Sequence, residues 1–524
     1  MTKRLWLSAA MFVVGAALLG SAQFAGAASQ KQGGIFKVGT TGASVQIDPQ
    51  TSYVTTGWWL EYATAAKLYN YRPGGRLVPE VASRFAISND GTHYTFFLRP
   101  GFRFSDGAPV TARNFKYAFD RVRNPDLGSP GAQFLQGVNG VHAHGMKLLI
   151  DTTMRSGRLL TILAMPFFQA TSTKLPADRE VADVKSMADL PTAGPYAFAL
   201  NDVNRLTSLR RNPYWKPGPG RTAPRNLDGV DVQWNLDERT AFEMVKANQL
   251  DEGPIPAAEQ QGLADQYGVN KSRFWVKPTS DCIGLIAFNN NRNLFRGNPE
   301  LRKAFNWALD RTVYNGPGYS RSPWTHLLPP GYPGSITKPS RQPYAPTADV
   351  QRAHDMAVGH LRDGKVKVFF RTSTPLSLAQ AEQVRRALLY LGFAYDDITM
   401  KGFGGAAIYE AMGKRGSEFD MAVSLGWCAS VIEGSAFLPF GGAPPFFPDL
   451  PHYRSKIAAA LRLKGKARFA ALGKLDLDIT RNVAPVAVTN IFNNLYFFSN
   501  RVDPRSLRYH AVYSDWSIPA LALR

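Results

Sequence analysis

The sequence predicts a protein of the α/β or mixed α+β class, because segments with strand and helix patterns alternate along the chain. Its 524 residues are enough for roughly two to four domains and a sizeable hydrophobic core. Hydrophobic residues make up 44% of the chain and charged residues 19%, which is typical of globular proteins. This composition excludes a long coiled coil and a small disulfide scaffold, and no internal repeat is visible.

The clearest strand and helix patterns lie in the N-terminal half. Tyr94, Phe96 and Leu98 recur at every second position, which is the period of a strand. Thr111 is in position to cap a helix with apolar residues at the i, i+3, i+4, i+7 spacing. The predicted buried face of this helix consists of Phe115, Ala118, Phe119 and Val122.

The same alternation continues through the rest of the chain. Asn298 precedes a proline at the first position of a predicted helix, and Gly392 closes another helix at 378–391. Residues 455–482 are expected to be helical and basic. The remaining predicted elements are strands at 34–39, 365–370 and 419–426, and helices at 58–69 and 235–250.

The N-terminus has the three parts of an export signal. Lys3 and Arg4 form the positive region, residues 5–20 are apolar, and the sequence AGA at 25–27 is a cleavage motif. An uncleaved membrane anchor is the alternative, but the apolar stretch is short for a membrane span. No cysteine lies near the motif, so we expect cleavage after Ala27, no lipid anchor and a periplasmic location.

The chain has two cysteines, Cys282 and Cys428. An exported compartment is oxidising, which favours a disulfide between them. Two buried free thiols are the alternative. The sequence has no C-x-x-C pattern, so it supports neither a redox motif nor a zinc site.

The formal net charge of +21 is high, and such a charge often indicates nucleic acid or an acidic surface as partner. An exported protein rarely meets nucleic acid, so we expect no nucleic-acid partner. A positively charged cleft that favours an anionic ligand is the alternative explanation of this charge. We interpret the basic residues of the 455–482 segment as a solvated face; they are Lys456, Arg462, Lys464, Lys466, Arg468 and Lys474.

The usual catalytic and cofactor motifs are absent from the sequence. It contains no P-loop, no H-E-x-x-H, no G-x-S-x-G and no G-x-G-x-x-G after a strand. His142 and His144 stand close together without a further ligand, and Asp396-Asp397 follows a helix end, so both pairs are read as surface residues. We therefore predict no catalytic residues, no metal, no cofactor and no enzyme.

Several segments match a family pattern in the same order. They are LVPEVA at 77–82, SNDG at 88–91, YTF at 94–96, LRPGFRFSDG at 98–107 and TA at 111–112. Shorter matches are IDP at 47–49, GPY at 194–196, NPYW at 212–215, LRKA at 301–304, LDR at 309–311, LPPG at 328–331, FDM at 419–421, GW at 426–427 and APV at 484–486. The chain thus resembles, over nearly its whole mature length, the extracytoplasmic solute-binding proteins of the peptide/nickel family of ABC importers, which is solute-binding protein family 5.

This resemblance implies an α/β fold of two lobes that close on a ligand about a hinge, with an extra domain inserted in the N-terminal half. Residues 1–27 are the expected signal peptide, and residues 67–189 are the expected inserted domain. The expected lobes are residues 28–66, 190–280 and 497–524 for the first, and residues 281–496 for the second.

The sequence GWCA at 426–429 is most similar to the oligopeptide-binding branch of the family. That branch carries a cysteine pair linked near the hinge at similar spacing. The resemblance therefore implies a disulfide between Cys282 and Cys428.

The resemblance also implies a ligand site between the lobes. Gly426, Trp427 and Cys428 would pair with an extended ligand through their backbone, as a strand adds to a sheet edge. From the first lobe, the turn from Val45 to Asp48 would face the cleft. Trp58 or Trp59 would supply an aromatic wall there, with plain core packing as the alternative for each.

One position departs from the family pattern. Peptide-binding relatives usually have an Asp two places after Cys428, and this carboxylate meets the α-ammonium group of the peptide. Here the residue is Ser430, whose neutral hydroxyl cannot neutralise a buried ammonium. Glu433 would substitute if the loop is shifted.

The resemblance implies a periplasmic substrate-binding component of an ABC importer, which captures a peptide or peptide-like solute and delivers it to a membrane permease. Non-peptide ligands such as sugars or opine-like amino-acid conjugates are the alternative, because of Ser430. An exported hydrolase and a polyanion-binding surface protein are the other classes that we weighed. We expect a monomer whose only contact with the membrane is through the permease.

Overall fold

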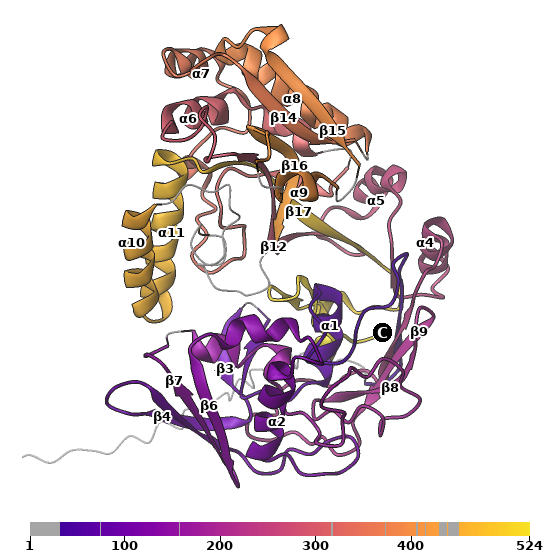
Figure 1. Cartoon of the computed structure of the whole chain (residues 1–524). Helices are drawn as coiled ribbons and strands as arrows, with labels where there is room; N and C mark the ends of the chain where they lie inside the picture. Colours follow the sequence, from indigo (N-terminus) through magenta and orange to yellow (C-terminus); the bar gives the residue numbers. More distant parts are fainter. Residues whose placement is uncertain are drawn as a thin grey trace, which may run out of the picture.

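One mixed sheet of 11 strands runs through both lobes of this computed structural model (Figure 1). Its order is β15-β14-β16-β12-β17-β11-β1-β10-β9-β8, and β13 pairs with β17 outside this path. The strands are β1 Ile35–Gly39, β8 Tyr196–Asp202, β9 Leu206–Arg211, β10 Gly229–Gln233, β11 Glu252–Gly253, β12 Phe274–Phe288, β13 Arg321–Pro323, β14 Val366–Arg371, β15 Ile398–Phe403, β16 Met421–Cys428 and β17 Val486–Phe498. The fold is thus the predicted two-lobed α/β fold.

The structure describes residues 32–73, 75–156, 158–315, 318–372, 374–404, 407–413, 416–428, 438 and 450–524. The predicted signal peptide lies outside these residues. Within them, none of the helices has the length and apolar character needed to cross a membrane.

The lower lobe of Figure 1 contains β1, β8 to β11 and a second, four-stranded antiparallel sheet. This sheet has the order β4-β5-β7-β6 and consists of β4 Ala82–Ile87, β5 His93–Leu98, β6 Val138–His144 and β7 Lys147–Thr152. Two helices of the lower lobe are α1 (Thr55–Thr64) and α2 (Ala112–Arg123), and β2 (Tyr69–Arg72) forms a hairpin with β3 (Arg76–Pro79). The predicted strand at 94–98 and the predicted buried face of α2 are confirmed.

The upper lobe is a sheet covered by helices on both faces. Alternate strand residues such as Val368 and Val423 pack on one face in a cluster with α6 (Pro299–Ala308), α7 (Val350–Ala357) and α8 (Pro375–Leu391). Their neighbours Phe369 and Ala422 pack on the other face with α9 (Ala407–Gly413), α10 (Pro451–Arg462) and α11 (Gly465–Asn482). The alternation of a strand therefore divides its side chains between two cores.

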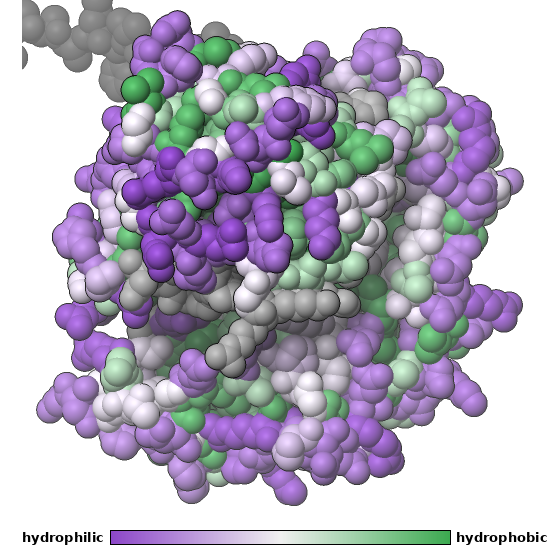
Figure 2. Space-filling model, turned by 45° about the horizontal axis from the view of Figure 1, so that its top comes forward, coloured by the Kyte–Doolittle hydropathy of each residue, from purple (hydrophilic) through white to green (hydrophobic). Residues whose placement is uncertain are grey.

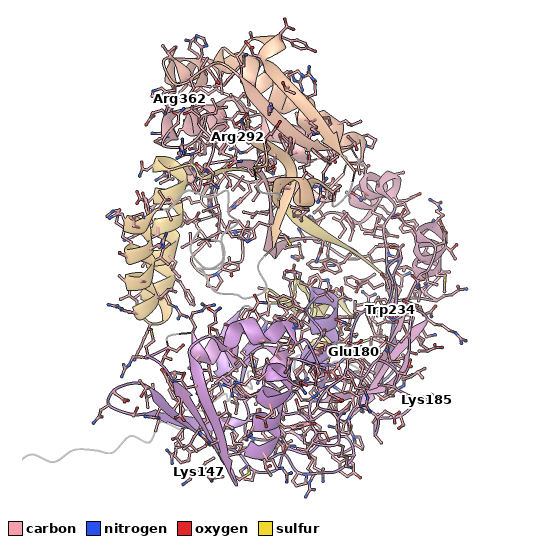
Figure 3. The ribbon with its side chains drawn as sticks, in the orientation of Figure 1. Lys147, Glu180, Lys185, Trp234, Arg292 and Arg362 are labelled. Atoms are coloured by element: carbon pink, nitrogen blue, oxygen red, sulfur yellow. The ribbon has the colours of Figure 1, made fainter. Side chains whose placement is uncertain are left out.

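Arg292 ties the end of β12 to the start of β16 in this lobe (Figure 3). Its Nε donates to an Asp420 carboxylate oxygen at 2.7 Å, and the other oxygen accepts from the backbone amide of Lys367 at 2.8 Å. The carboxylate thus holds β12, β14 and β16 in place at the end of the sheet.

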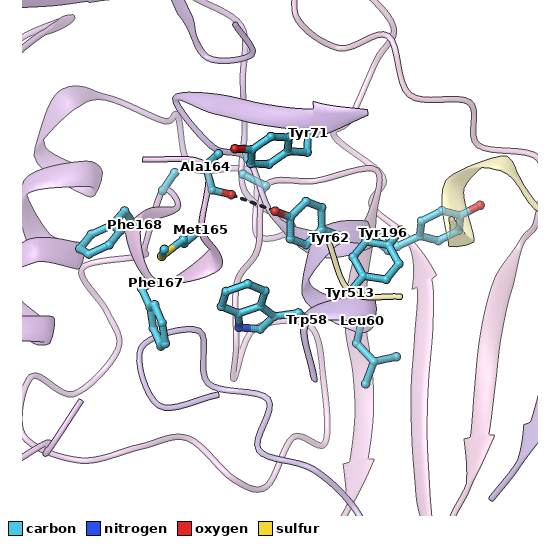
Figure 4. Close-up of a cluster of buried hydrophobic side chains, with 14 of the residues drawn as sticks. Trp58, Leu60, Tyr62, Tyr71, Ala164, Met165, Phe167, Phe168, Tyr196 and Tyr513 are labelled. Atoms are coloured by element: carbon cyan, nitrogen blue, oxygen red, sulfur yellow. Dashed lines mark hydrogen bonds between the residues drawn. The ribbon is translucent and has the colours of Figure 1, made fainter. Parts of the chain in front are cut away.

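Aromatic side chains dominate the core of the lower lobe (Figure 4). The Tyr62 hydroxyl donates to the carbonyl of Ala164 at 3.2 Å, and Trp58 meets Phe167 edge to face with ring centroids 5.9 Å apart. The same cluster includes Phe36 of β1 and Phe96 of β5, so the two sheets of this lobe share one core.

The 455–482 segment differs from the prediction in two respects. It belongs to two helices, because Leu463 and Lys464 are extended and Gly465 has a φ of 52°, which breaks the helical path. Arg468 is buried, so its assignment to a solvated basic face was wrong; the other five basic residues of that face are exposed.

Asp48 and Arg121 form an ion pair in which both side chains are fully buried. Two nitrogens of Arg121 donate to the two carboxylate oxygens at 2.9 and 2.8 Å. The carboxylate also accepts from the backbone amides of Gln50 and Val181, each at 3.0 Å. This network fastens the turn before α1 to α2 and to the segment around Val181.

We expect Asp48→Asn to lower the free energy of unfolding by about 3–5 kcal/mol, because it leaves the buried guanidinium without its counter-charge. Urea denaturation measures this. Asp120→Asn is the control, since it removes one carboxylate from the exposed pair with Lys116 at 2.7 Å and should cost less than about 1 kcal/mol. Equal losses in the two variants would contradict the role of the buried pair.

Candidate ligand-binding site

Two strands, β12 and β17, belong to both lobes (Figure 1). In the lower part Phe274 to Pro278 pair with Phe497 to Asn493, and in the upper part Ile283 to Ala287 pair with Ile491 to Val486. The ladder is irregular between Pro278 and Ile283. A break of this kind is where two rigid lobes joined by strands can rotate relative to each other.

The far end of β16 lies beside this break and is paired with a strand on one side. On one side Trp427 and Gly426 pair with Ile283 and Gly284 of β12. On the other side β14 reaches only Met421 and Ala422. Within the described part of the chain, the backbone of Leu425 and Gly426 therefore has no strand on its second side.

Polar side chains that the sequence analysis did not identify surround this edge. The Gly426 amide donates to the Tyr409 hydroxyl of α9 at 3.4 Å, and the Arg371 guanidinium lies 5.0 Å from the centroid of the Tyr409 ring. The Arg371 Nε is buried without a hydrogen-bond partner. Helix α9, which carries Tyr409, lies on the side of the upper lobe that faces the lower lobe (Figure 1).

A hollow separates the two lobes on one face of the molecule (Figure 2). Figure 2 shows a hollow between the two halves of the molecule, with hydrophobic side chains on its walls. Gly426 is exposed and Trp427 is half-buried, so this part of β16 is accessible to a ligand.

The predicted residues of the Val45–Asp48 turn differ in their exposure. Val45 is half-buried and packs against the lower core. Asp48 is fully buried in its ion pair with Arg121, and its carboxylate oxygens are occupied by donors of the protein. The carboxylate thus holds the turn in place and does not project into the hollow.

Trp58 and Trp59 are both buried, with 4% of each residue exposed. The Trp58 indole donates to the carbonyl of Ser52 at 3.1 Å, and the Trp59 indole donates to the carbonyl of Trp516 at 2.8 Å. The structure therefore places both in the lower core, which is the alternative weighed for each from the sequence.

The residues after β16 are described only in part. The register places Cys428 directly opposite Cys282. Ser430 and Glu433 lie outside the described residues.

Glu180 is a further carboxylate of the lower lobe that the sequence analysis did not single out (Figure 3). It accepts hydrogen bonds from Gln46 at 3.2 Å and from Thr51 at 3.0 Å, and it is exposed. The fold thus brings a solvated negative charge beside the Val45–Asp48 turn from a segment far away in sequence.

Two carboxyl groups lie near the lower end of the hinge. Glu252 of β11 pairs with Phe498 of β17, and Asp515 belongs to the short strand β19 (Asp515–Trp516). Burial raises the pKa of Asp515 to about 7 and holds the pKa of Glu252 well above its usual range, and the neighbouring Asp515 raises it further. These groups therefore carry less negative charge at neutral pH than ordinary carboxyl groups.

Comparison with known proteins gives the family. The model for bacterial extracellular solute-binding proteins, family 5 (middle region) matches residues 76–444, which is more than half of the chain. Over 255 residues the chain is 27% identical to the dipeptide-binding protein DppE of Bacillus subtilis, covering 44% of each chain. Over 428 residues it is 26% identical to the glutathione-binding protein GsiB of Escherichia coli, covering 77% of this chain and 78% of the relative.

The matched stretches span about half the length of the first curated relatives. Among solved structures, the clavulanic acid biosynthesis oligopeptide binding protein 2 is similar with a TM-score of 0.79 and 19% identity, over 94% of this chain and 96% of that chain. At this identity the structural likeness establishes the fold alone. The family model and the fold agree with the motifs quoted from the sequence, and the chain belongs to family 5 of the bacterial extracellular solute-binding proteins.

Proposed function

We propose that this protein is the exported substrate-binding component of an ABC importer, which captures a peptide or peptide-like solute by lobe closure and delivers it to a membrane permease. The observation that carries the proposal is the exposed outer edge of β16 at Gly426, which lies beside the break in the β12–β17 ladder. An extended ligand can add to such an edge as a further strand. Rotation about the break would then bring the lower lobe onto the ligand.

Charged groups on the two lobes suit a ligand with ionised ends. Arg371 offers an unpartnered Nε to a carboxylate. For an ammonium group, Glu433 and Glu180 are the candidate carboxylates, since Ser430 stands where relatives usually have Asp. A non-peptide ligand, such as an opine-like conjugate, is the alternative that Ser430 leaves open.

The proposed location is the periplasm, after removal of residues 1–27. The export motif in the sequence and the extracellular nature of the family support it. The protein would act as a monomer and reach the membrane only through the permease.

We also propose the division into lobes expected from the resemblance, with the boundary between residues 280 and 281. The ladder irregularity between Pro278 and Ile283 supports this boundary. On β17 the irregularity falls between Ile491 and Asn493, slightly before the expected boundary at residue 497. The separate β4–β7 sheet supports an inserted domain within residues 67–189.

The function is tested on protein purified from the periplasm without unfolding. We expect native mass spectrometry to detect a bound solute, and small-angle scattering to detect compaction when that solute is returned to the stripped protein. A spread of masses fitting short peptides supports a general peptide carrier, and one discrete mass supports a specialised binder. The proposal would be contradicted if the purified protein held no bound solute and added peptides caused no compaction.

The second prediction concerns Arg371. Arg371→Gln should weaken binding of the identified solute about tenfold, because it removes a charge-assisted hydrogen bond to a ligand carboxylate. Isothermal titration with the stripped protein measures the change. The control is Arg362→Gln, which removes the same charge from an exposed position in the upper lobe (Figure 3). Unchanged affinity in the Arg371 variant would show that this cation does not contact the ligand.

The third prediction concerns the proposed disulfide. Directly opposite residues of antiparallel strands have Cα atoms about 4.5–5.5 Å apart, within the range of disulfides, and Cys282 and Cys428 are such a pair. The intact mass of the exported protein should fit cleavage after Ala27 and be lower than the thiol form by two hydrogen atoms. Reduction should lower the free energy of unfolding by at most about 5 kcal/mol, the chain-entropy value for a loop of about 146 residues. Free thiols in protein from the periplasm would refute the disulfide.

A further inference from the structure

A cavity of about 400 Å³ lies in the lower lobe, and all of its lining residues belong to that lobe. Its walls are the β2–β3 hairpin, the loop at 222–224 and the C-terminal segment from 506 to 520, together with Tyr62 of α1. None of the upper-lobe strands or helices contributes to it. The cavity is therefore formed without lobe closure.

Three arginines, Arg72, Arg76 and Arg508, line this cavity, and its lining contains no acidic residue. Arg72 donates to the Thr222 hydroxyl, and Arg508 donates to the carbonyls of Arg505 and Leu507 at 2.8 and 3.0 Å. Across the described ranges, none of these three arginines forms an ion pair, and Arg76 is exposed. Their guanidinium groups are thus available to an anion, which they can hold through paired N–H groups.

Asn70 also lines the cavity and is 7% exposed. Its Nδ2 donates to Glu80 Oε1 at 3.0 Å, whereas its Oδ1 is buried without a hydrogen-bond partner. A buried carbonyl oxygen without a donor is costly, so a ligand that supplies an O–H group would satisfy it.

The imidazole of His510 adds no positive charge to the cavity. Its Nε2 lies 3.1 Å from the carbonyl of Tyr71, and its Nδ1 accepts from the Val512 amide at 3.3 Å. Burial lowers its pKa to about 3, so the ring is neutral at pH 7. The positive charge of the lining comes from the arginines.

We infer that this cavity binds an oxyanion that also carries a hydroxyl group, such as hydrogen phosphate or a phosphate monoester, independently of the ligand between the lobes. The three guanidinium groups meet the anionic oxygens, and Asn70 Oδ1 accepts from the hydroxyl. This site goes beyond the proposed transport function, because it uses neither β16 nor the hinge.

The test compares two anions of similar shape and charge. Hydrogen phosphate has an O–H group and sulfate at the same pH has none. With protein prepared in phosphate-free buffer at constant ionic strength, isothermal titration should show saturable phosphate binding about tenfold tighter than sulfate binding. Glycerol phosphate and malate, titrated in parallel, distinguish a phosphate site from a hydroxycarboxylate site.

Arg76→Gln and Arg508→Gln should each weaken phosphate binding about tenfold. The matched control is Arg113→Gln, which removes one charge from the exposed face of α2 and should leave binding unchanged. Native mass spectrometry of the same variants should detect an unaltered solute between the lobes, which separates this site from the transport function.

Three results would overturn the inference. The first is that none of the four anions, which are phosphate, sulfate, glycerol phosphate and malate, shows saturable binding. The second is an equal loss of binding in the Arg113 variant, which would indicate unspecific attraction to the positive protein. The third is loss of the solute between the lobes in the Arg76 and Arg508 variants, which would make the cavity part of that site.

Discussion

The arrangement of this molecule depends on β12 and β17, which are strands of both lobes at once. These strands connect the two lobes directly, and their ladder is irregular between Pro278 and Ile283. Phe274 and Phe497 anchor the lower ends in a cluster with α4 (Glu238–Lys246) and α5 (Gln260–Tyr267). Ile286 and Val488 anchor the upper ends in the two upper cores. The outer edge of β16 lies beside this junction because β16 pairs with the upper part of β12.

The sequence was informative where structure is decided locally. The alternation of Tyr94 and Phe96 predicted β5, and Gly392, with its φ of 101°, ended α8 as expected. The candidate site depends on contacts between distant segments, and there the prediction was weaker. Asp48 and Trp58 lie in family-typical positions, but their burial depends on Arg121 and Phe167, which no local pattern links to them. Arg371 and Tyr409 meet only because α9 packs beside the end of β14.

The positively charged residues lie in several structural settings, which the net charge of the chain does not distinguish. Arg311 is fully buried and donates to backbone carbonyls of Val488 and Asn306, so its charge is spread over peptide dipoles inside the upper lobe. Arg302 does the same at Val483 and Ala484. Exposed lysines on α10 and α11 are solvated. The arginines beside the β2–β3 hairpin belong to a third setting, in which cations line a concave surface whose described lining holds no acidic residue.

An unpaired sheet edge is ordinarily a hazard, because the edge strand of another protein can add to it and start aggregation. Natural proteins usually protect such edges with charges, prolines or bulges. Here the β12–β16 ladder is irregular between Ala422 and Leu425, where Ser424 has a φ of 61°, directly before the outer edge at Gly426. A bulge of this kind increases the twist of the strand, which hinders pairing with the flat edge of another folded sheet, whereas a short extended chain can follow the twist. The irregularity therefore protects this edge while the backbone at Gly426 stays exposed.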